Sequence, residues 1–122
     1  MNRRYSFYNW EQSKVKIMNV LCETIVCRAK ENTDARLERM IKTRIEFSKR
    51  SDFALNSWYG RSQSDELLFM IQTTFANLES YHELKSSIQE KLDSKDGGLE
   101  ACFSGPPLVG MFEIDENMIE SG

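Results

Sequence analysis

The feature that most constrains the fold is a run of apolar residues at helical spacing, from Asp65 to about Ser94. Its apolar positions recur every three or four residues, as on one face of an α-helix. They are Leu67, Leu68, Ile71, Phe75, Leu78, Tyr81, Leu84, Ile88 and Leu92. Acidic residues at the start and lysines at the end suit the helix dipole. We therefore predict one long amphipathic helix over this segment, ended by two glycines at 97 and 98.

A second apolar segment predicts a helix from Asn9 to about Glu31. Asn9 and Gln12 match a capping box at its start. In helical projection only a narrow strip is polar, and Val20 and Cys27 form a separate patch beside the main apolar arc. A surface helix shows an apolar stripe of roughly 100°. This wider one is expected at the centre of the fold, with neighbours on more than one side.

Residues 35–50 predict another helix, with Leu37, Ile41 and Ile45 as its apolar ridge. A short helix is expected from Ser51 to Gly60, with or without a break at Ser51. Prolines 106 and 107 stop helical structure, and the candidate strand 108–114 has no partner strand. The sequence thus predicts an all-α fold, a three- to four-helix bundle with a central apolar first helix over residues 1–98 and an irregular acidic tail over residues 99–122.

The amino-terminal residues and the cysteine content bear on the compartment. Two arginines near the start are followed by no apolar signal core. Three cysteines are an odd number without framework spacing, which is ordinary in a reducing compartment. No apolar run approaches the ~18 residues of a membrane span. We expect an intracellular protein, cytoplasmic or nuclear, that does not enter a membrane.

Residues that could carry catalysis or bind a metal lack the required arrangement. His82 is the only histidine and is expected to be a partly buried core residue. Cys22 and Cys27 lack the paired spacing of a zinc site. None of the glycines opens a phosphate loop. The sequence therefore predicts no catalytic residue, no cofactor, no metal and no small-molecule substrate.

The expected function is instead a non-enzymatic one, a small helical subunit or adaptor in a protein complex. Its partner is another protein or a second copy of the chain. Apolar residues left over by the helices and the tail, and one arginine within an apolar arc, are the candidate contacts. They are Val20, Cys27, Arg44, Phe69, Leu108, Phe112 and Ile114. The tail could dock on the folded part or stay free.

The alternative is a nucleic-acid-associated module that uses the basic face of the helix 35–50. Five cations on that face could follow phosphates, although the acidic pI of about 5.2 argues against it. They are Arg36, Arg39, Lys42, Lys49 and Arg50. Residues 37–45, 65–69 and 76–81 also resemble the helical domain of GINS replication-complex subunits. The chain departs from that family because only fifteen residues follow Pro107, too few for its β domain.

Overall fold

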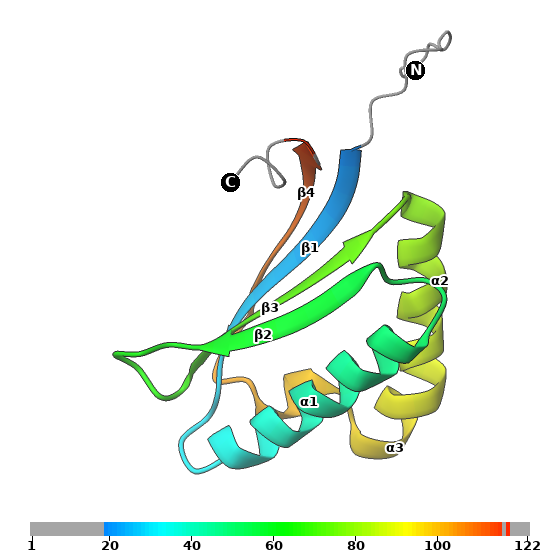
Figure 1. The fold of residues 1–122 in the computed structure, drawn as a ribbon. Helices are drawn as coiled ribbons and strands as arrows, with labels where there is room; N and C mark the ends of the chain where they lie inside the picture. Colours follow the sequence, from blue (N-terminus) through cyan, green and yellow to red (C-terminus); the bar gives the residue numbers. More distant parts are fainter. Residues whose placement is uncertain (1–18, 116, 118–122) are drawn as a thin grey trace, which may run out of the picture.

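The computed structural model describes residues 19–115 and 117, and it shows an antiparallel sheet with helices packed on one face (Figure 1). The strand order is β2-β3-β1-β4. The elements are β1 (Asn19–Arg28), α1 (Asp34–Arg50), β2 (Asn56–Arg61), β3 (Leu68–Phe75), α2 (Leu78–Ile88), the π-helical turn η1 (Gln89–Asp93), α3 (Ser94–Asp96), the 3-10 turn η2 (Leu99–Cys102) and β4 (Leu108–Asp115). The predicted all-α bundle is therefore wrong, and the fold class is α+β.

Strand β1 occupies the centre that was predicted for a helix. It pairs with β3 on one side and with β4 on the other. The β-branched residues Val20, Thr24, Ile25 and Val26 favour an extended backbone. Because both faces of this central strand carry apolar side chains, its sequence is apolar almost all round. Residues 9–18 of the predicted helix lie outside the described residues.

The predicted long helix over 65–94 is in fact a strand and a helix joined at residues 76 and 77. Along β3 the side chains alternate between partly buried and buried, with Phe69 and Phe75 in the core. Helix α2 then begins after Asn77, whose side chain accepts a hydrogen bond from the backbone N–H of Ser80 at 2.8 Å. Apolar residues four positions apart satisfy both periods, since four is even and also close to one helical turn. This ambiguity explains the error.

Helix α1 confirms the prediction for residues 35–50. Its ridge of Leu37, Ile41 and Ile45 is buried against the sheet. The helix ends at Ser51, and the short helix expected next is wrong, because Asn56–Arg61 forms edge strand β2. The core between sheet and helices contains Cys27, Ala29, Leu37, Met40, Ile41, Ile45, Phe69, Ile71, Cys102 and Phe103.

The segment predicted as an irregular tail contains the fourth strand. Residues 108–115 pair antiparallel with β1, with Val26 opposite Leu108 and Asn19 opposite Asp115. The missing partner strand was the segment read as the first helix. The carboxy-terminal segment therefore docks on the folded part up to Asp115, as one of the two alternatives expected.

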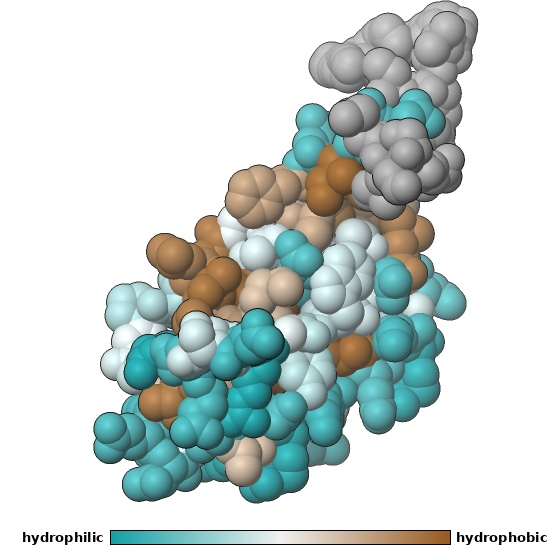
Figure 2. All heavy atoms as spheres, turned by 60° about the vertical axis from the view of Figure 1, so that its left-hand side comes forward, coloured by the Kyte–Doolittle hydropathy of each residue, from teal (hydrophilic) through white to brown (hydrophobic). Residues whose placement is uncertain are grey.

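The sheet face turned away from the helices, here called the open face, carries the even-numbered residues of the four strands. Arg28 is the only charged residue that the described strands place there. A row of polar side chains crosses it, in which Trp58 Nε1 donates to Gln72 Oε1 at 3.0 Å and Gln72 Nε2 donates to Thr24 Oγ1 at 3.0 Å. Figure 2 turns this side forward and shows brown and pale side chains along the sheet, with teal gathered at the lower end.

Candidate ligand-binding pocket

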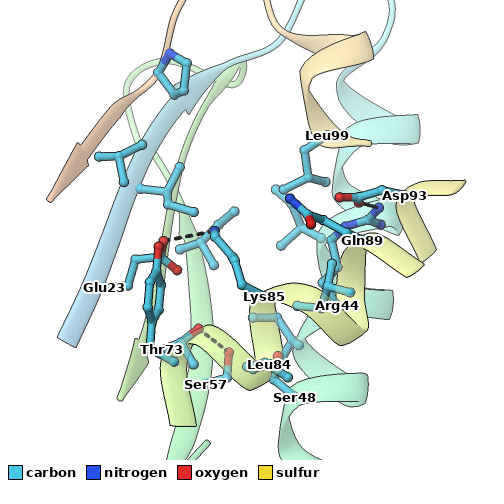
Figure 3. Close-up of a pocket in the computed structure, with 18 of the residues that line it drawn as sticks. Glu23, Arg44, Ser48, Ser57, Thr73, Leu84, Lys85, Gln89, Asp93 and Leu99 are labelled. Carbon is cyan, nitrogen blue, oxygen red and sulfur yellow. Dashed lines mark hydrogen bonds and ion pairs between the residues drawn. The ribbon is translucent and has the colours of Figure 1, made fainter. Parts of the chain in front are cut away.

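A pocket of about 220 Å³ lies between the helix-side face of the sheet and the helices α1, α2 and η1. Its walls are mostly apolar and include Ile41, Ile45, Ile71, Phe75 and Leu84. Figure 3 shows the sheet on one side and the helices on the other, with polar side chains pointing into the space between them. A core layer at this position would normally be filled with apolar side chains.

Three polar residues interrupt the apolar side of the sheet, and strand register aligns them. Ser57 on β2 is directly opposite Thr73 on β3, and Thr73 is directly opposite Glu23 on β1. All three are buried and line the pocket. Because directly opposed Cβ atoms in a sheet stand about 5 Å apart, these side chains form a continuous polar row across three strands.

At one end of the polar row, the two hydroxyl groups are joined by one hydrogen bond. Ser57 Oγ and Thr73 Oγ1 are 2.9 Å apart. Each hydroxyl can donate one hydrogen bond and accept others. The hydroxyl that accepts this bond keeps its own O–H, so the pair can still donate one hydrogen bond toward the pocket and can also accept there.

At the other end, Glu23 pairs with a lysine from the opposite wall. Lys85 on α2 donates from Nζ to Glu23 Oε2 at 3.0 Å (Figure 3). The same Nζ lies 5.6 Å from the centre of the Tyr81 ring. The Glu23 side chain is 9% exposed, whereas that of Lys85 is 43% exposed. The carboxylate is therefore part of the interior, and the ammonium group reaches it from the mouth of the pocket.

Arg44 closes a third side by holding the turn after α2. Its guanidinium donates to Asp93 Oδ1 at 2.6 Å and to both carboxylate oxygens of Asp96 at 2.9 Å. Burial acts to lower the pKa of Arg44, but the hydrogen bonds to Asp96 and Asp93 outweigh it and raise the pKa above its ordinary value. The same hydrogen bond from Arg44 lowers the pKa of Asp96. This clasp fixes η1 and α3 against α1 at the rim of the pocket.

The predicted contact residues separate into two groups in the structure. Cys27 and Phe69 are 3% and 1% exposed inside the core, so both are corrected from contact residues to core residues. Arg44 is buried and paired with acids instead of facing a partner. Val20, on the open face, is only 8% exposed and is likewise corrected to a buried residue. The other three lie on the open face of edge strand β4 and stay predicted contacts: Leu108, Phe112 and Ile114.

The five basic residues of α1, namely Arg36, Arg39, Lys42, Lys49 and Arg50, are all exposed, as predicted from the helical projection. Two of them have protein partners, since Arg36 donates to the carbonyl of Asp96 at 3.5 Å and Arg50 lies 3.9 Å from Glu46. The structure contradicts the resemblance to the helical domain of GINS subunits, because part of the matched segment 65–69 belongs to strand β3. The helical domain that the resemblance implied is absent from the described part of the chain.

Other expectations concern metals, His82 and membranes. Within residues 19–115 and 117, no three His, Cys, Asp or Glu side chains are grouped to hold a metal ion. His82 is exposed on α2, with its ring 5.1 Å from that of Tyr81, so its prediction as a core residue is wrong. Across the same described residues, every helix is too short or too polar to traverse a bilayer.

Comparison with known proteins gives matches at the level of structure only. No protein-family model matches the chain, and no curated protein sequence does. Rv0793 from Mycobacterium tuberculosis superposes with a TM-score of 0.67 at 9% identity, covering 76% of this chain and 92% of that one. A protein described as an antibiotic biosynthesis monooxygenase gives 0.66 at 10% identity, covering 75% and 95%. A Deinococcus radiodurans protein, a candidate for the same activity, gives 0.65 at 15% identity, covering 79% and 93%.

At these identities the likeness shows the fold. It is nevertheless the finding that overturns the predicted function. The predicted function as a non-enzymatic helical adaptor depended on an all-α bundle, which the structure does not have. That prediction and its nucleic-acid-binding alternative are therefore both wrong. The exclusion of an enzyme is likewise contradicted, because several neighbours with this fold are described as monooxygenases or candidates for that activity.

The residues of the polar row were missed at the level of sequence. Glu23 lies within the segment predicted as the first helix, and Ser57 and Thr73 belong to no motif. The available signal was alternation, because Ile71, Thr73 and Phe75 fall on one face of a strand with a polar residue in the middle. That signal becomes visible only when the segment is examined with period two.

Proposed function

We propose that this protein is a small enzyme that binds a compact, mainly apolar organic molecule in the pocket and acts on it as an oxygenase. The observation that carries the proposal is the polar row, which places two hydroxyls and a carboxylate against unfilled space inside an apolar layer. Pockets of this composition, apolar with a few convergent polar groups, are typical of ligand sites. Support for the reaction class comes from the fold neighbour described as an antibiotic biosynthesis monooxygenase.

The size of the pocket limits the ligand. Drug-sized ligands occupy pockets of about 300–1,000 Å³, whereas a cavity of about 150 Å³ accepts benzene. At about 220 Å³ this pocket suits one substituted ring or a molecule of similar bulk. Ile45, Ile71 and Leu84 would contact the apolar body of such a molecule.

The polar groups would orient the ligand and move charge. Glu23 can accept a proton or a hydrogen bond from a ligand hydroxyl. The ammonium group of Lys85, 3.0 Å from Glu23 Oε2, holds this carboxylate in position at the mouth of the pocket. The hydroxyls of Ser57 and Thr73 offer hydrogen bonds at the far end of the row.

The test is a binding and turnover screen on the full chain. One-ring alcohols, phenols and ketones are screened for an increase in melting temperature, and binders are then incubated in air while oxygen uptake and product mass are recorded. Thr73→Val should weaken binding about fivefold, since one hydrogen bond contributes about 1 kcal/mol. Thr74→Val, the neighbouring residue on the open face, is the matched control and should bind normally. The proposed binding site is refuted if no compound stabilises the protein, or if both variants lose binding equally. If compounds bind but no oxygen is consumed, only the assignment as an oxygenase is refuted.

A further inference from the structure

One oxygen of the buried Glu23 carboxylate has no protein partner among the residues that the structure describes. Lys85 takes Oε2, and neither a side chain nor a backbone N–H of the described residues donates to Oε1. The side chain is about nine-tenths buried and belongs to the pocket lining (Figure 3). A buried charged acceptor without a donor is costly, so a ligand that brings a donor to Oε1 gains from satisfying it.

Among the described residues that line the pocket, no cation is left without an acidic partner. Arg44 is held by Asp93 and Asp96, and Glu100 adds a further acid to the lining. Lys85 is the remaining cation, and Glu23 already neutralises it. A carboxylate ligand would therefore face Glu23 without a compensating charge, whereas a neutral donor would not.

We infer that the pocket selects uncharged molecules that present an O–H or N–H donor to Glu23 Oε1, and that it rejects the corresponding carboxylates. The inference rests on the proposed function, because it concerns the ligand of the same pocket. It assigns specificity to Glu23 and limits Lys85 to holding the other carboxylate oxygen. An N–H or O–H on a single ring satisfies both this requirement and the size limit.

Three one-ring probes separate the possibilities in titrations of the full-length protein. Benzyl alcohol carries a neutral donor, benzyl methyl ether lacks the donor, and benzoate carries the charge. We expect benzyl alcohol to bind at least about tenfold more tightly than either of the others, the fold-change of one hydrogen bond to a charged group. Glu23→Gln, which keeps the shape and removes the charge, should abolish most of the discrimination against benzoate.

Two further variants control the experiment. Glu113→Gln makes the same chemical change on the same sheet face, in β4 and outside the pocket lining, and should keep the wild-type preference. Lys85→Met should also keep the preference for the alcohol. Equal binding of alcohol and benzoate to the wild type would overturn the inference, and so would a preference for benzoate that Lys85→Met removes. Absence of binding by any one-ring compound would instead refute the proposed function.

Discussion

Replacing Phe69 by alanine separates the observed fold from the helical prediction. In a helix over 65–94, Phe69 lies on the polar side, where truncation would cost little. In the structure its ring is 1% exposed in the core, with the guanidinium of Arg61 5.0 Å from the ring centre. Burying a phenylalanine removes about 150–250 Å² from water, which at about 25 cal/mol per Å² gives an upper bound near 4–6 kcal/mol. Truncated core phenylalanines lose about 3–5 kcal/mol, and we expect about 4 kcal/mol here.

The measurement is urea unfolding followed by far-UV circular dichroism. Domains of this size are stable by about 5–15 kcal/mol, so Phe69→Leu, expected to cost about 1 kcal/mol, provides a second point if the alanine variant is largely unfolded. Met70→Ala is the matched control, because Met70 is the next residue of β3, faces the opposite side and is partly exposed. A loss below about 1 kcal/mol for Phe69→Ala, or a loss no larger than that of Met70→Ala, would refute the assignment of Phe69 to the core.

Three other predictions follow from the same contacts. Asp96→Asn should flatten the loss of stability below about pH 5, because Arg44 lowers the folded pKa of Asp96 and the stability that this carboxylate contributes is lost as the pH falls through the folded value. Urea titrations at several pH values measure this, and an unchanged profile would contradict it. Burial raises the pKa of Cys27 to about 11, so iodoacetamide at pH 8 should modify this thiol only after the protein unfolds. Peptide mass mapping measures the modification, and rapid labelling of Cys27 in the native protein would contradict its burial. Self-association stays a prediction, and the nearly uncharged open face is the surface on which we expect it. Sedimentation should show a dimer that Phe112→Asp dissociates and that the exposed-site control Leu55→Asp leaves intact. A wild-type monomer at micromolar concentration would contradict the prediction of self-association.

Helix α1 could be predicted from sequence because the information that forms it is local. Its ridge residues lie one turn apart, and its ends are marked by Asp34 and by Ser51 within a few positions. The register of this ridge requires no knowledge of any other element. The prediction of which side of α1 is buried and which is exposed was therefore correct, including the exposure of its basic residues.

The strands could not be predicted in this way, because each depends on a distant partner. Strand β4 is stable as a strand only beside β1, whose paired residues are more than eighty positions away, as for Val26 and Leu108. In β1, apolar side chains on both faces remove the alternation that normally indicates a strand. Once β1 was assigned to a helix, the segment 108–114 had no partner, and one error caused the next.

The candidate site depends even more strongly on pairing than the fold does. Glu23, Thr73 and Ser57 come from three strands and share no sequence spacing; they meet because antiparallel register places them opposite one another. Apolar residues of similar size would fill the same layer and would avoid burying a carboxylate that has one oxygen without a donor among the described residues. Stability alone therefore gives no reason for this row, whereas a ligand that needs a buried acceptor does. The energetic cost of the row and the unfilled space that it faces therefore both support the proposed ligand site.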